Sequence, residues 1–87
     1  MPIRRIRVTS IFKKSFRKLP KDIQEKAEGK EMLFRENPFD PRLGTHKLHG
    51  KYKNFLAFTV VGQYRILFAF TNGGADFINI GTHEIYQ

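Results

Sequence analysis

Three histidines, His46, His49 and His83, carry the only imidazole groups in this sequence of 87 residues. Imidazole accepts and donates a proton near neutral pH, so these side chains are the first candidates for acid–base chemistry. The chain contains no cysteine, which excludes thiolate nucleophiles, disulfides and thiolate zinc sites and favours the reducing cytoplasm. Because no carboxylates accompany His46 and His49 at metal-site spacing, we predict neither a metal nor another cofactor.

Arg65 is the most unusual charged residue, because it stands within the otherwise apolar stretch of residues 64–71. An arginine in such a strand either forms a salt bridge on the sheet surface or offers its guanidinium group to a phosphate. The residues alone leave both interpretations open.

Positive charge is concentrated in two blocks. The net charge is +8, and residues 1–21 and 41–65 hold eight and five Lys and Arg, respectively, without an acidic residue. Such blocks favour binding to phosphates or to an acidic protein, with ordinary solvated cations as the alternative. The candidate contacts are Lys13, Lys14, Arg17 and Lys18 in the first block, and Lys47, Lys51 and Lys53 in the second.

The elements that must position these residues indicate a single domain, residues 1–87, with an α+β fold. Alternating apolar residues predict a strand over 3–8, followed by a helix that Ser10 caps and that ends before Pro20. A second helix is expected from about 21 to 36, where Asn37-Pro38 ends it, and a loop then leads to residues 45–48.

Apolar residues 55–61 and 64–71 flank Gly62-Gln63 and predict a hairpin, and residues 75–80 form a last strand. The order β-α-α-β-β-β predicts two helices packed on one face of a small, mainly antiparallel, twisted sheet. We expect no membrane span, since no stretch approaches about 18 apolar residues, and a site on an open surface, since so short a chain cannot enclose a large cofactor.

The whole chain resembles the RelE/ParE toxin superfamily, and three elements resemble its YafQ-like mRNA interferase branch. These elements are His46-x-Leu48-x-Gly50, the strand that begins Tyr64-Arg65, and the terminal Gly81-Thr82-His83. The resemblance implies a RelE-like toxin of a type II toxin–antitoxin pair, monomeric when free, which cuts mRNA in the ribosomal A site. Its partners would be mRNA, the ribosome and a cognate acidic antitoxin.

The resemblance also implies catalytic roles for His46 and His83, contact of Arg65 with the scissile phosphate, and base stacking or proton transfer by Tyr86. The chain departs from the branch at two positions, because Thr59 and Gln63 stand where the branch carries a histidine and an aspartate. Apolar residues around Leu56 and Phe58 likewise replace the lysines that the RelE branch carries on its central strand.

Metal-free RNA cleavage needs a base for the 2′-hydroxyl group, a cation beside the phosphate and an acid for the 5′-oxygen. His46 and His83 can divide the two proton transfers in either order, and Arg65 can stabilise the charge. Lys47, Lys51 and Lys53 would hold flanking phosphates. His49 is either a third participant or a plain turn residue.

Two other functions remain open from the sequence. A ParE-like branch of the same fold inhibits DNA gyrase through protein contacts and needs no nuclease residues. A noncatalytic RNA- or ribosome-binding module is favoured by the departures at Thr59 and Gln63.

Overall fold

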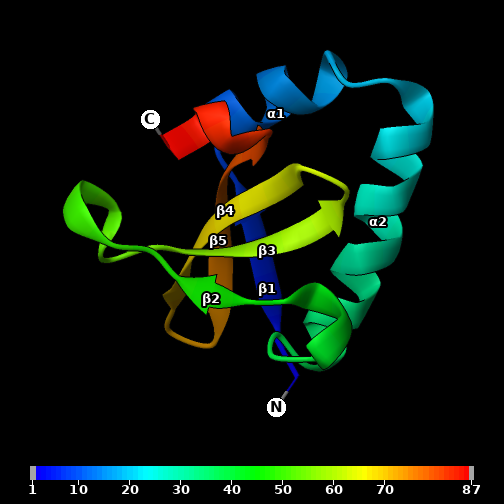
Figure 1. Cartoon of the computed structure of the whole chain (residues 1–87). Helices are drawn as coiled ribbons and strands as arrows, with labels where there is room; N and C mark the ends of the chain where they lie inside the picture. Colours follow the sequence, from blue (N-terminus) through cyan, green and yellow to red (C-terminus); the bar gives the residue numbers. More distant parts are fainter. Residues whose placement is uncertain (1, 87) are drawn as a thin grey trace.

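The computed structural model describes residues 2–86, apart from the side chain of Tyr86, and shows two helices packed on one face of a five-stranded sheet (Figure 1). The helices are α1 (Ser10–Arg17) and α2 (Lys21–Glu36). The strands are β1 (Arg5–Val8), β2 (His46–Lys47), β3 (Leu56–Val61), β4 (Tyr64–Thr71) and β5 (Gly74–Gly81), and the short 3₁₀ turns are η1 (Pro41–Leu43), η2 (Gly50–Tyr52) and η3 (His83–Tyr86). The predicted α+β fold is confirmed.

The strands lie in the order β1-β5-β4-β3-β2, with β1 parallel to β5 and every other pair antiparallel. The predicted hairpin is confirmed, with Gly62 at φ 55° in its turn. The strand β2 was not expected, because residues 45–48 were placed at the end of a loop. Two residues are too few to show the alternation of a strand, and β2 exists through its pairing with Leu56 and Ala57.

The start of α1 corrects one expectation, since Thr9 rather than Ser10 is the N-cap. The Thr9 hydroxyl accepts a hydrogen bond from the Phe12 amide at 3.0 Å and donates one to the Ile78 carbonyl at 2.6 Å. Thr9 therefore fixes the start of α1 against β5. In the described part of the chain, no helix is long and apolar enough to cross a membrane.

The core lies between the helices and the sheet and consists largely of phenylalanine rings. Phe34 of α2 is fully buried, and its ring centre lies 5.1, 4.8 and 5.3 Å from those of Phe58, Phe68 and Phe77. Phe12 of α1 contacts Phe77 at 5.6 Å. One aromatic cluster therefore holds both helices on β3, β4 and β5.

Side chains alternate between the two faces of a strand, so residues between the buried positions point away from the helices. In β4, Ile66 and Phe68 belong to the core, which places Arg65 on the opposite face, here called the open face. Residues paired across strands share a face, so Thr59 of β3 and Gly81 of β5 flank Arg65 there.

Candidate functional site on the open face

Arg65 is half-buried at the start of β4, between its pairing partners Thr59 and Gly81. Its Nη1 donates hydrogen bonds to the carbonyl oxygens of Gly62 at 2.7 Å and Tyr64 at 3.2 Å. Among the described residues, no carboxylate lies within ion-pair distance of Arg65, so the alternative of a surface salt bridge is not realised there. Because both hydrogen bonds use Nη1, the N–H groups of Nε and Nη2 can donate to an anion.

The turn η3 folds over the open face beside Arg65, and Gly81 permits this approach. A Cβ atom at Gly81 would lie only 2.7 Å from Cγ2 of Ile85 in η3. His83 is the first residue of η3 and is exposed, so His83 and Arg65 lie at the same end of the sheet. The side chain of Tyr86 lies outside the described residues, and its role stays a prediction.

His46 lies in β2 on the open face, opposite Ala57 of β3. Its Nδ1 lies 3.0 Å from the carbonyl oxygen of Gly44. A carbonyl oxygen only accepts, so Nδ1 carries the proton and Nε2 of the neutral imidazole has a free lone pair. Gly44 has φ 60°, a left-handed conformation that favours glycine. The sequence signal for this hydrogen bond is Gly44 itself, two residues before His46, and this role of Gly44 was not predicted from the sequence.

The other predicted contacts of the second basic block surround η2. His49, which precedes η2, and Lys47, Lys51 and Lys53 are all exposed. The ammonium group of Lys51 lies 5.3 Å from the ring centre of Tyr52, in cation–π distance. Figure 1 shows η2 in a loop that protrudes beyond β2, so these cations lie at the margin of the sheet.

The two departures from the YafQ-like pattern both lie beside Arg65. Thr59 is paired with Arg65, and its Oγ1 is 3.6 Å from the position that a Cβ atom of Gly44 would take. Gln63 is exposed in the turn between β3 and β4. A hydroxyl and an amide therefore occupy positions where the pattern has a histidine and a carboxylate, and neither is a strong base.

The sheet brings Arg65, Thr59 and η3 together but holds His46 and His83 apart. The strand of His46 and the strand that leads to His83 are separated by β3 and β4, which corresponds to about 14 Å across the sheet. Arg65 lies on β4, between the two. Among the described residues, no group of three metal-ligating side chains is present.

The four candidate contacts of the first basic block lie on α1 or at its C-cap, and all are exposed: Lys13, Lys14, Arg17 and Lys18. Two of these residues also border a groove of about 370 Å³ between α1, α2 and β1. We call it the α1–β1 groove, and it is lined by Ile6, Val8, Phe12, Lys13, Phe16, Arg17, Ala27, Glu28, Glu31, Arg35, Ile66 and Phe77. The sequence did not predict this groove, because it forms only where three separate elements meet.

Two helices on one face of a β1-β5-β4-β3-β2 sheet form a fold that this chain shares with RelE/ParE toxins. YafQ from E. coli strain BL21(DE3) superposes with a TM-score of 0.80 at 19% identity, covering 97% of this chain and 99% of YafQ. YafQ in the E. coli DinJ-YafQ toxin-antitoxin complex gives a TM-score of 0.77 at 19% identity, covering 97% of both chains.

A YoeB/ParE toxin from Agrobacterium tumefaciens matches with a TM-score of 0.79 at 12% identity, over 92% of this chain and 99% of the toxin. The archaeal RelE-RelB complex from Pyrococcus horikoshii OT3 matches with a TM-score of 0.74 at 14% identity, covering 92% of this chain and 94% of the matched chain. No protein-family model matches the sequence, and no curated protein is significantly similar to it. The predicted resemblance to RelE/ParE toxins is thus confirmed at the level of the fold.

Proposed function

We propose that this chain is the toxin of a type II toxin–antitoxin pair and cleaves mRNA on the ribosome, in the cytoplasm. The observation that carries the proposal is the free guanidinium edge of Arg65, which lies on the open face of a RelE/ParE toxin fold beside the turn that begins with His83. A guanidinium group of this kind suits a phosphate whose charge grows in the transition state.

The proposed reaction requires no metal. A base removes the proton of the 2′-hydroxyl group, the 2′-oxygen bonds to phosphorus, and the bond to the 5′-oxygen breaks as an acid protonates that oxygen. We assign the base to His46, because the Gly44 carbonyl favours the tautomer whose lone pair is on Nε2, and the acid to His83. Attacking and leaving oxygens lie on opposite sides of phosphorus, which suits two imidazoles on either side of Arg65.

Lys47, Lys51 and Lys53 would bind phosphates that flank the cleaved bond, and His49 would bind RNA at the same margin. Tyr86 would stack on a base. Tyr86→Phe tests this role, because stacking survives the loss of the hydroxyl group whereas proton transfer does not.

The decisive experiment is single-turnover cleavage of mRNA bound to ribosomes. We expect His83→Gln and His46→Ala each to reduce the rate by about a hundredfold or more while the melting temperature stays close to that of the parent chain. Full activity of His83→Gln would refute the mechanism. Inhibition of gyrase supercoiling without mRNA cleavage would instead identify a ParE-like inhibitor, and RNA binding without cleavage a noncatalytic module.

We further propose that the α1–β1 groove and the unpaired edge of β1 receive the acidic antitoxin. The groove is apolar at Phe12 and Phe16, Val8 is 38% exposed on the edge strand, and neither Lys13 nor Arg17 forms an ion pair with a described residue. An acidic segment can add a strand to β1, bury apolar side chains in the groove and pair with the free cations.

Co-expression with a small acidic protein, if the neighbouring gene encodes one, tests this partner. A complex should form and melt at a higher temperature than the free chain. Val8→Lys should weaken the complex, whereas Ile11→Lys, on an exposed residue outside the groove, should not. Equal loss of affinity in both variants would refute the assignment of the groove.

A further inference from the structure

A second pocket, of about 520 Å³, lies where the chain leading into β1, the β4–β5 turn and the loop after α2 meet. Phe39 and Phe70 form its aromatic wall, with ring centres 5.9 Å apart and planes inclined by 36°. Their exposed fractions are 59% and 41%, unusually high for phenylalanine. We call this site the aromatic pocket; Ile3, Arg4, Pro38 and Gly74 also line it.

The aromatic pocket is distant from the proposed cleavage site. Phe70 lies five residues beyond Arg65 along β4, which corresponds to about 17 Å. Phe70 also lies on the helix-bearing face, where its ring meets the buried Phe68 edge-on at 5.2 Å. The pocket is therefore at the other end and on the other face of the sheet, so the nucleotide that is cleaved at Arg65 would not occupy it.

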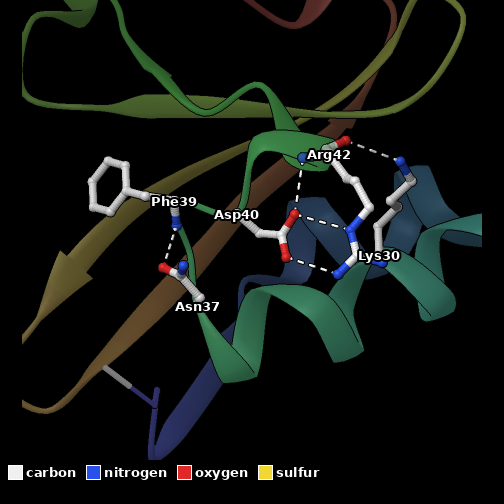
Figure 2. A network of polar contacts seen from close by, with 5 residues as sticks. All are labelled: Lys30, Asn37, Phe39, Asp40 and Arg42. Atoms are coloured by element: carbon white, nitrogen blue, oxygen red, sulfur yellow. Dashed lines mark hydrogen bonds and ion pairs between the residues drawn. The ribbon is translucent and has the colours of Figure 1, made fainter.

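A polar network holds Phe39 in place although its ring is exposed (Figure 2). The Phe39 amide donates to Oδ1 of Asn37 at 3.0 Å, and Arg42 binds the Asp40 carboxylate with Nε and Nη2 at 3.0 and 2.9 Å. Lys30 donates to the Arg42 carbonyl oxygen at 3.2 Å and ties the loop to α2. A ring on so well supported a loop loses little conformational entropy when it binds a ligand.

The charge around the pocket indicates the class of ligand. Arg4 is the only charged residue among the described residues that line it. Asp40, the acidic residue next to Phe39, is neutralised by Arg42. Exposed phenyl rings beside an unopposed arginine suit a group with a flat aromatic face and a negative charge, and nucleotides have both.

We propose that the aromatic pocket binds one nucleotide of single-stranded RNA, with the base stacked on Phe39 and Phe70 and the phosphate at Arg4. The site is independent of the proposed cleavage, because it uses none of the residues assigned to that reaction. It would contact an RNA segment other than the one that is cut.

Titration of the full chain with a tetranucleotide of 2′-O-methyl adenosine, which cannot be cleaved by 2′-hydroxyl attack, tests the proposal. We expect NMR shifts of the ring protons of Phe39 and Phe70 that saturate with RNA concentration. Phe39→Ala should weaken this binding about fivefold or more, Phe39→Leu should weaken it similarly, and Phe39→Tyr should preserve it, because stacking requires an aromatic face.

The matched controls separate stacking from general effects of charge and folding. Met32→Ala removes an apolar side chain, 70% exposed, outside the pocket, and should leave the titration unchanged. Arg4→Gln should lower the slope of log affinity against log salt by about 0.7, whereas Lys21→Gln should not, because Lys21 is exposed away from the pocket. His83→Gln should still bind, which distinguishes failure of this site from failure of the cleavage site.

Two outcomes would overturn the proposal. One is an oligonucleotide titration without shifts at the Phe39 and Phe70 rings, even if shifts occur on the open face. The other is unchanged RNA affinity of Phe39→Ala together with a loss of self-association in sedimentation, which would identify the pocket as a protein-docking surface.

Discussion

The guanidinium group of Arg65 is oriented before any ligand arrives, because two carbonyl oxygens hold a single nitrogen of it. Among the described residues, these two hydrogen bonds leave Nε and Nη2 available to donate to a ligand. A lysine offers only a point charge and cannot reproduce the planar contact.

We therefore expect Arg65→Ala to reduce single-turnover cleavage by about a hundredfold or more, and Arg65→Lys to recover only part of the loss. The melting temperature should change little, because the hydrogen bonds lie near the surface. Lys26→Ala, an exposed change of equal charge on α2, is the matched control. A similar loss in Lys26→Ala would mean that net charge alone drives the reaction.

Asp40 is the residue whose ionisation depends most clearly on the fold. Its pKa falls from 3.8 to about 2, first through the hydrogen bond from the Arg42 side chain and then through that from the Arg42 amide. A lowered pKa in the folded state stabilises the protein above the unfolded pKa, and this contribution is lost as the pH falls through the folded pKa.

Asp40→Asn should accordingly lower the free energy of unfolding at pH 7, and the difference from the parent chain should shrink below about pH 4 and be lost as the pH falls through about 2. Urea unfolding across this range measures the effect. In the Arg42→Gln background the pH dependence of Asp40→Asn should become smaller but should persist, because the hydrogen bond from the amide of residue 42 remains. An equal destabilisation at pH 2 and pH 7 would contradict the role of the ionised carboxylate.

At the scale of elements, two glycines differ in the space around them: Gly74 lies where two strands approach closely, and Gly29 lies on an open side of a helix. A Cβ atom at Gly74 of β5 would clash with the carbonyl oxygen of Arg5 in β1, and this main-chain atom cannot rotate away as a side chain could. At Gly29 in α2, nothing described lies within 4 Å of such an atom. Gly29 therefore has room for a methyl group, whereas Gly74 does not.

Gly29→Ala should raise the free energy of unfolding by about 0.5–1 kcal/mol, because alanine favours the helix. Gly74→Ala should lower it by about 1–3 kcal/mol, because β1 must shift away from β5. Chemical denaturation of both variants gives the two values. A Gly74→Ala variant that is as stable as the parent chain, or more stable, would show that the β1–β5 approach is looser than described.

Elements with strong local signals were predictable from the sequence, and those formed by distant contacts were not. Asn37-Pro38 ends α2 where expected, and Gly62-Gln63 turns the hairpin. The two-residue β2 depends on its pairing with Leu56 and Ala57 of β3, and β1 pairs with β5 almost seventy residues further along the chain.

In the candidate site too, features with a local signal were predictable and features that depend on the folded structure were not. Alternation in β4 puts Arg65 on the face opposite Ile66, so its direction was predictable. The sequence could not show whether a carboxylate would pair with Arg65. Asp76, for example, comes from another strand and pairs with Arg7 instead. The proton on Nδ1 of His46 likewise depends on the folded position of Gly44.

At the scale of the whole molecule, α1 combines two proposed interactions. Its cations face the solvent, where ribosomal RNA can bind, and Lys13 and Arg17 also border the groove proposed for the antitoxin. An antitoxin in the groove would therefore cover part of the charge that attracts RNA, and the two partners would compete.

Ribosome binding should depend strongly on salt, and neutralising Lys13, Lys14, Arg17 and Lys18 should weaken it. The slope of log affinity against log salt should fall by about 0.7–0.9 for each phosphate contact that is removed. Replacing Lys21 and Lys26 of α2 with glutamine serves as the charge control. An unchanged slope after neutralisation of α1 would place RNA docking elsewhere.

The parallel pairing of β1 with β5 joins the first strand of the chain to the last, as in the partners Arg5 and Gly74 or Val8 and Phe77. During synthesis β1 leaves the ribosome first but must wait for β5 before it can pair. Contacts at such sequence separation close late and slow folding. The sheet is therefore complete only after β5 has been translated and has emerged from the ribosome, and the toxin activity proposed here would arise no earlier than that.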